Sequence, residues 1–262
     1  MLIVILAGGK GTRILEETRL IPKALVRIGN KPIIEHIMEC YEKQGFNEFL
    51  ILTGYKGEKI FDYFKSKTNI TFLEEQKDCM IIKSSNSKVT VLDTGEETGS
   101  AARLRIARPY INEKRFMLTY CDGLCSVNFD NLLNFHKEHG GMVTLTAVRP
   151  EPRFGILEIM ENGKVKALRE KERRDSPVIN GGFMVIESDI FNFLTEEMNQ
   201  LEKDVLVPLS ENGKLTAFYH DGFWQCMDNI REKSFLEKLL AEDKAPWKRW
   251  DRSVPDIPDY AK

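Results

Sequence analysis

The chain opens with the stretch Leu2-Ile3-Val4-Ile5-Leu6-Ala7-Gly8-Gly9-Lys10-Gly11-Thr12-Arg13. Its first five residues are apolar, which predicts a strand buried on both faces of a sheet. The three glycines that follow let the backbone approach a ligand closely and leave its N–H groups free. We expect a short helix to begin near Thr12. A strand, a glycine turn and a helix N-terminus together form a site for a phosphate or a nucleotide.

Two well-known phosphate motifs do not fit this stretch, and a plain strand-to-helix turn remains the alternative. A P-loop has Lys followed by Ser or Thr after its last glycine, whereas Thr12 and Arg13 follow Gly11 here. A dinucleotide fingerprint has another glycine three positions after Gly11, where this chain has Ile14. The missing glycine disfavours an oxidoreductase of the Rossmann type.

The composition is that of an ordinary globular protein. The chain has 262 residues, 42% hydrophobic and 30% charged, which allows one large α/β domain or one domain with an appendage. The formal net charge of -2 gives no electrostatic reason to expect a nucleic acid partner. No apolar run reaches about 18 residues and no basic segment precedes the first strand, so we expect neither a membrane partner nor a signal peptide.

The cysteines and histidines show no metal-binding spacing. The five cysteines are odd in number and scattered, which predicts reduced thiols in a cytoplasmic protein. Cys121 and Cys125 are four positions apart, which is not a zinc spacing. His136 and His139 are three positions apart on a predicted helix, and we interpret them as part of a solvated helix face.

Strands and helices alternate in the first half of the chain. Apolar runs predict strands at 2–6, 48–53, 89–92 and 115–120, with helices at 31–45, 58–64 and 101–107 between them. This order predicts an α/β fold with a Rossmann-like, mostly parallel sheet and helices on both faces. Ligands of such sheets bind at the carboxyl ends of the strands, where the glycine loop, Asp93 and Asp122 are expected.

Smaller elements are predicted in the rest of the chain. The pattern is weak between 65 and 87, with an edge strand at 70–73 and a polar turn at 83–88. Asn162-Gly163 predicts a hairpin between strands at 156–160 and 164–168. The other predictions are helices at 129–139, 188–194, 202–210 and 229–240, strands at 142–148, 183–186 and 215–220, a turn at 180–182 and a polar-aromatic loop at 223–228.

Asp122 and Asp228 are the candidate metal ligands. Asp122 follows a predicted buried strand, and Asp228 precedes a predicted helix. If their carboxylates meet across a pocket, they supply the hard oxygen ligands that suit Mg²⁺ beside substrate phosphates. The alternatives are a strand-end carboxylate without a role and, for Asp228, an N-cap of the following helix.

Arg13 and Lys23 flank the glycine loop, and Pro22 stiffens the backbone before Lys23. A site that handles phosphate needs fixed positive charge, so both are candidates for it, and two surface bases are the alternative. Glu170-Lys171 by itself reads as an ordinary charged pair. Asn180-Gly181-Gly182-Phe183 is either a turn or a loop that hydrogen-bonds a polar ligand.

Taken together, these pieces resemble the sugar-phosphate nucleotidyltransferases, and most closely the members that join CTP to glucose 1-phosphate. The resemblance covers all but about the last dozen residues. Besides the opening stretch, the strings that carry it are Glu16-Glu17-Thr18, the segments 29–33, 54–57, 91–95, Asp122-Gly123, Arg153-Phe154-Gly155, Glu170-Lys171, 179–183, 222–228 and Lys244-Ala245-Pro246-Trp247.

The resemblance implies roles for individual residues. The implied nucleotide-binding residues are Leu6, Ala7, Gly8, Gly9, Gly11, Thr12, Arg13, Lys23, Thr98, Arg103 and Cys121. The implied acceptor-binding residues are Glu170, Lys171, Asn180, Gly181 and Trp224. Asp122 and Asp228 match the family's Mg²⁺ ligands, and Arg13, Lys23 and Lys171 would be the catalytic cations.

The implied reaction is Mg²⁺-dependent, in-line attack of a sugar 1-phosphate, glucose 1-phosphate first, on the α-phosphate of CTP. The products would be pyrophosphate and a CDP-sugar for polysaccharide biosynthesis. We expect a single domain over 1–245, with a nucleotide-binding half at about 1–125, an acceptor-binding half at about 126–245 and a tail at 246–262. The resemblance and the proline-rich tail favour a homo-oligomer.

The chain departs from the family pattern in four segments, the first of which has Ile21 where the family usually has a lysine. Ala24 replaces a proline after Lys23, and Glu172 replaces the proline after Glu-Lys. Ala101-Ala102 replaces a glycine pair, and Cys121 replaces the glycine before the metal Asp, and these two changes are expected to alter the bulk of the pocket. Two alternatives therefore stay open. The acceptor could be another phosphate monoester, sugar or not, or the chain could be a non-catalytic subunit that binds a nucleotide sugar, although the intact candidate metal ligands and lysines argue against the latter.

Overall fold

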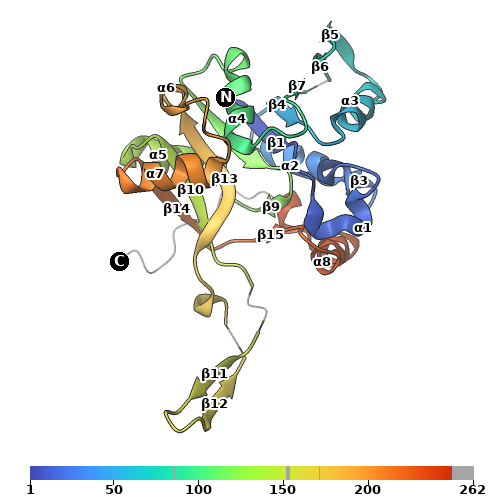
Figure 1. Cartoon of the computed structure of the whole chain (residues 1–262). Helices are drawn as coiled ribbons and strands as arrows, with labels where there is room; N and C mark the ends of the chain where they lie inside the picture. Colours follow the sequence, from blue (N-terminus) through green and yellow to red (C-terminus); the bar gives the residue numbers. More distant parts are fainter. Residues whose placement is uncertain (85, 152–153, 171, 250–262) are drawn as a thin grey trace.

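A nine-stranded mixed sheet forms the centre of the molecule, in the strand order β14-β10-β13-β8-β1-β4-β7-β6-β5 (Figure 1). The computed structural model describes residues 1–84, 86–151, 154–170 and 172–249. The strands are β1 (Leu2–Ala7), β4 (Glu48–Thr53), β5 (Thr71–Glu75), β6 (Cys79–Lys83), β7 (Lys88–Asp93), β8 (Arg115–Tyr120), β10 (Val143–Val148), β13 (Ile179–Glu187) and β14 (Leu215–His220). Only β6 and β13 run against the other seven, which confirms the predicted mostly parallel sheet.

Helices cover both faces of this sheet, as predicted. Ile3, Ile5 and Ala7 of β1 belong to one buried cluster, and Leu2, Val4 and Leu6 belong to the other. Successive side chains of a strand point to opposite faces, so an unbroken apolar run is what a strand with two covered faces requires. The helices are α1 (Leu15–Thr18), α2 (Ile33–Glu42), α3 (Gly57–Lys65), α4 (Ser100–Ile106), α5 (Phe129–His139), α6 (Ile190–Phe193), α7 (Val207–Glu211) and α8 (Ile230–Ala241), with a π-helical segment at Leu201–Leu206.

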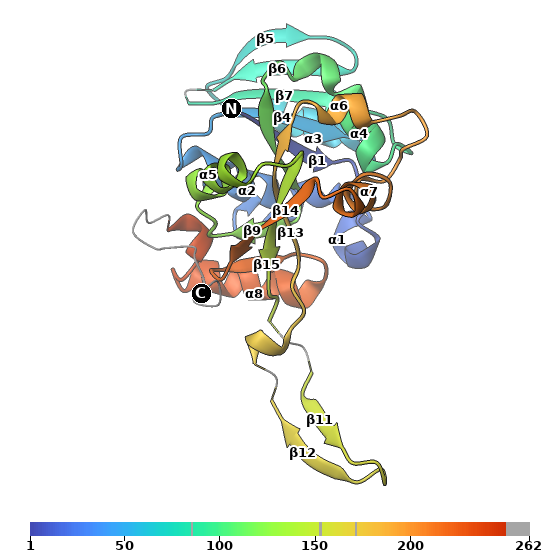
Figure 2. The same cartoon turned by 90° about the vertical axis from the view of Figure 1, so that its left-hand side faces the viewer.

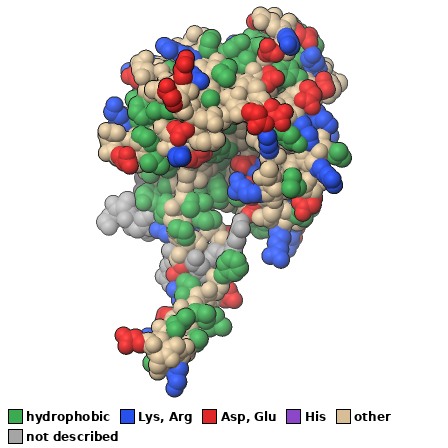
Figure 3. All heavy atoms as spheres, viewed as in Figure 1, with side chains coloured by type: hydrophobic (Ala, Val, Ile, Leu, Met, Phe, Trp, Pro, Cys, Tyr) green, Lys and Arg blue, Asp and Glu red, His purple; other side chains and the backbone are tan. Residues whose placement is uncertain are grey.

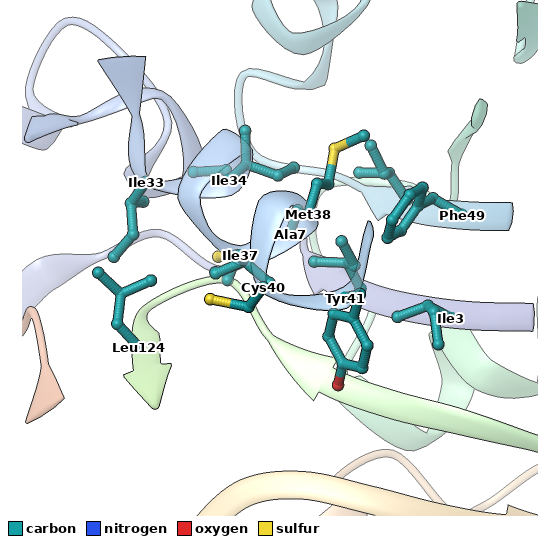
Figure 4. Close-up of a cluster of buried hydrophobic side chains, with 14 of the residues drawn as sticks. Ile3, Ala7, Ile33, Ile34, Ile37, Met38, Cys40, Tyr41, Phe49 and Leu124 are labelled. Atoms are coloured by element: carbon teal, nitrogen blue, oxygen red, sulfur yellow. The ribbon is translucent and has the colours of Figure 1, made fainter. Parts of the chain in front are cut away.

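The helix α2 shows how one face is packed. Its apolar side chains lie against Ile3 of β1 and Phe49 of β4, and Leu124 closes the cluster from below (Figure 4). Tyr41 of α2 stacks on Phe129 at the start of α5, with ring centroids 4.0 Å apart. This face is therefore a dense aromatic and aliphatic core, which fixes the first strand and the loop that follows it.

Three small two-stranded sheets are separate from the central sheet. They are β2 (Arg27–Ile28) with β3 (Lys31–Pro32), β9 (Gly123–Cys125) with β15 (Trp224–Cys226), and β11 (Ile156–Ile159) with β12 (Val165–Arg169). The β11–β12 pair confirms the hairpin predicted around Asn162-Gly163, and it projects far from the body (Figures 1 and 2).

Several local predictions were wrong, each for a physical reason. The segment 180–182 is not a turn but lies within β13, where Gly182 has a φ of 85° and the pairing with β10 shifts register. A glycine at positive φ occurs both in certain turns and in certain β-bulges, so the glycines alone do not separate the two. The expected loop at 223–228 contains β15, which at three residues is too short to show a period, and β6 (Cys79–Lys83), in the weakly patterned segment 65–87, was not predicted.

The interpretation of His136 as a solvated residue was also wrong. Its side chain is buried, with Nδ1 2.7 Å from Thr144 Oγ1 and Nε2 3.0 Å from Glu187 Oε1. Arg115 donates to the same Glu187 oxygen at 2.9 Å. Burial lowers the pKa of His136, although Glu187 acts in the opposite direction. His139 is exposed, as predicted.

This buried histidine predicts a pH dependence of stability. Because the pKa of His136 is lower in the folded chain, the unfolded chain binds more protons once the pH falls below about 6.5. The free energy of unfolding should therefore fall between pH 7.5 and 5.5. His136→Gln should reduce that fall, by at most about 1.4 kcal/mol, because pH 5.5 lies only one pH unit below the ordinary histidine pKa of about 6.5. Urea unfolding of both proteins at both pH values measures it, and equal falls would contradict the prediction.

No helix in the described part of the chain is both long and apolar enough to cross a membrane. All five cysteines are free thiols, and four of them are buried.

Candidate active site

The glycine loop sits directly on the guanidinium group of Arg103. Arg103, on α4, is 4% exposed and donates hydrogen bonds to the carbonyl oxygens of Gly8 at 3.0 Å, Thr53 at 2.6 Å and Gly95 at 2.8 Å. These carbonyls follow or end β1, β4 and β7, so one buried cation ties three strand ends together. A Cβ atom on Gly8 would lie 2.2 Å from Arg103 Cζ, which is why a glycine is needed there.

Arg103 therefore also holds the strand ends together from inside the protein, a role that was not predicted from the sequence. All the hydrogen bonds found for its guanidinium go to protein atoms in the loops at 8, 53 and 94–96. It borders the cavity from beneath, and its contact with a nucleotide stays a prediction. Thr98 is nearby, with its hydroxyl donating to the Thr94 carbonyl at 2.6 Å.

The two candidate metal ligands are brought together by the β9–β15 pair. Asp122 immediately precedes β9, and Asp228 follows β15. Cys226 lies opposite Gly123 in this pair, and the Met227 N–H donates to the Asp122 carbonyl at 2.8 Å. Residues more than 100 positions apart in the sequence thus place two carboxylates side by side at the edge of the sheet.

Lys23 joins the two carboxylates. Its Nζ atom lies 2.7 Å from Asp122 Oδ2 and 2.5 Å from Asp228 Oδ1, and its side chain is 8% exposed. Arg13 Nη1 adds a contact of 2.5 Å to Asp228 Oδ2. Burial alone would lower the pKa of Lys23, but the Asp122 and Asp228 carboxylates outweigh it and raise the pKa above its ordinary value. Lys23 is therefore a fixed ammonium ion.

The arrangement fits a divalent cation. The Asp122 and Asp228 oxygens both contact one nitrogen, so they converge on a single cation position. Two carboxylates open to a cavity are ligands that Mg²⁺ accepts together with substrate phosphates and waters. Asp228 does not have the capping role left open above, because Asn229 is the N-cap of α8 and its side chain accepts from the Glu232 N–H at 3.0 Å.

A cavity of about 380 Å³ lies on the nucleotide side of this carboxylate pair. Of the predicted nucleotide-binding residues, it is lined by Leu6, Gly8, Gly9, Gly11, Thr12, Arg13, Lys23, Thr98, Arg103 and Cys121. Ala7 does not line it and is instead buried in the core. Lys10 and Glu97, which were not predicted, also line this cavity. They form an ion pair, with Lys10 Nζ 2.6 Å from Glu97 Oε1.

A larger cavity of about 850 Å³ lies on the other side, between the body and the base of the hairpin, where the surface is hollowed (Figure 3). Asn180, Gly181 and Trp224 line it, as predicted for acceptor-binding residues. Glu170 is exposed and is not part of the lining, and Lys171 lies outside the described residues. The two cavities share Gly9, Arg13, Ser100, Tyr120, Asp122 and Gln200, so the carboxylate pair stands at their junction.

Two changes were expected to alter the bulk of the pocket. The one at Cys121 lines a cavity, the alanine pair does not, and neither reaches the acceptor cavity. Ala101 is buried in the core of α4, and neither Ala101 nor Ala102 lines a cavity described here. Cys121 lines only the nucleotide side. Glu172 forms the capping box of the short helix at Arg173–Asp175 and does not line the acceptor cavity.

Known proteins share the sequence pattern and the fold of this chain. Residues 2–232 match the nucleotidyl transferase family. The glucose-1-phosphate cytidylyltransferases of Salmonella typhi and Salmonella typhimurium are each 40% identical to this chain over 258 residues, which are 96% of this chain and 100% of those proteins. Among solved structures, HddC from Yersinia pseudotuberculosis has the same fold, with a TM-score of 0.70 at 23% identity, over 91% of this chain and 99% of that one.

Proposed function

The chain belongs to the nucleotidyl transferase family, and from that premise we propose that it transfers the cytidylyl group of CTP to a sugar 1-phosphate, with release of pyrophosphate. Glucose 1-phosphate is the first acceptor to consider, because the cytidylyltransferase relatives match the chain from end to end. We propose residues 1–245 as one catalytic unit, since a single sheet carries both cavities.

One observation carries the proposal. The Lys23–Asp122–Asp228 cluster stands where a cavity under the glycine loop meets a second, larger cavity. A transfer between two phosphorylated substrates needs this arrangement, because both phosphates must reach the same charged point from opposite sides.

In the proposed reaction, an oxygen of the acceptor phosphate attacks the α-phosphorus of CTP in line. The new P–O bond forms as the bond to the β-phosphate oxygen breaks, and pyrophosphate leaves with that electron pair. Gly8, Gly9 and Gly11 present backbone to the triphosphate, and Arg13 and Lys23 stabilise the charge that builds on it. Lys171, by the family resemblance, would hold the acceptor phosphate.

The acceptor phosphate is already an anion, so no general base is required of the protein. Asp122 and Asp228 would hold Mg²⁺, which when bound neutralises charge on phosphate oxygens. The protein's contribution is then positioning and fixed charge rather than covalent chemistry.

A release assay for pyrophosphate tests the proposal. With Mg²⁺ present, each of the four NTPs and dTTP is paired with glucose 1-phosphate and other phosphate monoesters. Turnover with CTP and glucose 1-phosphate supports the proposal, and turnover with CTP and only another monoester keeps the chemistry but changes the acceptor. Binding of a CDP-sugar with no turnover for any pair would instead support the non-catalytic alternative.

We also propose that the protein is a homo-oligomer, because the hairpin leaves one face uncovered. Leu157 lies opposite Leu168, and Ile159 opposite Val165, so the four side chains share one face and are 52% to 73% exposed. The ion pair of Glu158 and Lys166 belongs to the polar part of the hairpin. A lone two-stranded hairpin is only marginally stable in water. A second copy carries the same apolar face, so self-association covers both at once.

Replacing Leu157 and Leu168 together by lysine should break this association, because two charges would then have to be buried in it. The expected result is a lower mass by light scattering at the same protein concentration, with an unchanged thermal unfolding of the body. Lys166→Ala serves as the matched change on the polar part of the hairpin and should leave the mass unaltered. A wild-type monomer, or a double variant of unchanged mass, would contradict the proposal.

A further inference from the structure

Glu202 lies in the wall of the acceptor cavity and belongs to no motif identified in the sequence. It belongs to the π-helical segment Leu201–Leu206 and lines the cavity with Tyr120 and Gln200. The Tyr120 hydroxyl donates a hydrogen bond to the Glu202 carboxylate. Tyr120 ends β8, two positions before Asp122, so this pair stands next to the reaction centre.

The charges of the cavity are unevenly placed. Its charged lining residues, among those described, are Arg13, Asp122, Glu151, Glu202 and Asp228. Arg13 is bound to Asp228, and Lys23 joins that carboxylate to Asp122, so the positive charge is concentrated at the junction of the cavities. Away from that junction, the charged groups of the described lining are the carboxylates Glu151 and Glu202.

We propose that Glu202, oriented by Tyr120, determines acceptor specificity: it accepts hydrogen bonds from hydroxyl groups of the acceptor and repels a second anionic group. This inference rests on the proposed function and narrows it to phosphate monoesters whose remaining part is neutral and polyhydroxylated. A carboxylate accepts hydrogen bonds from several hydroxyls at once, whereas a carboxylate or phosphate on the acceptor would face like charge in a partly enclosed site. Glu202 is thus a ligand for the acceptor, and Tyr120 is its positioning residue.

The backbone that carries Glu202 is firmly anchored. We call residues 199–202 the strap. Asn199 accepts hydrogen bonds from the N–H groups of Gly99, at 2.8 Å to its side chain, and of Ala101, at 2.9 Å to its carbonyl. The Leu201 N–H donates to the Ser100 hydroxyl at 2.7 Å. A Cβ atom on Gly99 would lie 2.2 Å from the Asn199 carbonyl oxygen, so the strap docks closely on the start of α4.

Tyr120 is fixed from the opposite side. A Cβ atom on Gly182 would lie 2.6 Å from Tyr120 Cδ2, so the ring rests on the glycine bulge of β13. The Tyr120 hydroxyl, so placed, donates to the Glu202 carboxylate. The carboxylate is therefore held in one orientation before an acceptor arrives.

Steady-state kinetics with three acceptors test the inference. Glucose 1-phosphate is compared with glucuronic acid 1-phosphate, which adds a carboxylate, and with glucosamine 1-phosphate, which adds an ammonium group. For Glu202→Gln we expect the KM for glucose 1-phosphate to rise about tenfold, since a hydrogen bond to a charged group is lost. The KM for CTP should stay within about twofold, because the amide retains the fold. The ratio of kcat/KM for the glucuronic acid ester over glucose 1-phosphate should rise about tenfold as like charge is removed.

Tyr120→Phe should give a smaller change of the same kind, and Glu211→Gln, an exposed carboxylate on α7, should change nothing. If Glu202→Gln leaves both the acceptor KM and the ratio unaltered, the inference is wrong while the proposed function stands. If the wild-type enzyme prefers glucosamine 1-phosphate to glucose 1-phosphate, Glu202 binds a cationic group of the acceptor, and the proposal of a neutral acceptor is wrong. If the wild type turns over none of the three esters with CTP, the proposed function itself fails, and the inference fails with it.

Discussion

Asp122→Asn or Asp228→Asn is expected to lower kcat about a thousandfold while the protein stays folded. Each carboxylate offers an oxygen to the same cation position, and an amide at either place keeps the shape but loses the charge. Metal stabilisation of transferring phosphoryl groups is worth several kcal/mol, and each 1.4 kcal/mol is a factor of ten. The loss should appear in kcat more than in the KM for CTP, because the contacts proposed for the glycine loop and Arg13 with the nucleotide are left intact.

The matched control is Asp62→Asn, which changes an exposed carboxylate in the middle of α3. It should retain wild-type turnover and the same thermal unfolding midpoint. Near-normal Mg²⁺-dependent turnover by either Asp122→Asn or Asp228→Asn would show that these carboxylates are not the metal site.

Lys23→Met should have the second large effect, and it should act in opposite directions on metal binding and on turnover. Lys23 contacts both carboxylates at 2.7 Å and 2.5 Å, so a divalent cation must compete with its ammonium group. Without Lys23, Arg13 still contacts Asp228 but Asp122 loses its contact with the ammonium group, so the pair carries more negative charge and attracts a cation more strongly. Mn²⁺, followed by electron paramagnetic resonance in the absence of nucleotide, should bind about ten times more tightly, a gain of about 1.4 kcal/mol.

Turnover of the same Lys23→Met protein should fall about a hundred- to a thousandfold, because a fixed positive charge beside the triphosphate is lost. Lys137→Met, which changes an exposed lysine of α5, should alter neither quantity. Unchanged or weaker Mn²⁺ binding by Lys23→Met would contradict the view that Lys23 compensates the carboxylate pair in the metal-free enzyme.

The sequence predicted the fold well wherever a long apolar run or period exists. The run from Leu2 to Leu6 predicted a strand covered on both faces, and the two core clusters confirm it. Short elements such as β9 and β15 have three residues each and show no period. Yet this pair decides the site, since it brings Asp122 and Asp228 together over a separation that no local pattern reveals.

Site residues that belong to a sequence motif could be predicted. Site residues that are placed only by contacts between distant segments could not. Most of the residues expected around the nucleotide line one cavity, because they sit at the carboxyl ends of neighbouring parallel strands. Arg103 also anchors the glycine loop, and only its contact with Gly8 in the folded chain shows this. Tyr120 and Glu202 are 82 positions apart and belong to no motif, so their pairing appears only in the folded chain.

An isotope label shows whether an oxygen of the acceptor phosphate itself attacks the α-phosphorus of CTP. Glucose 1-phosphate carrying ¹⁸O in its phosphate is incubated with the enzyme, CTP and Mg²⁺, and the products are weighed by mass spectrometry. We expect the CDP-glucose to retain all of the ¹⁸O and the pyrophosphate to contain none. Label in pyrophosphate, or pyrophosphate formed without any CDP-sugar, would contradict it.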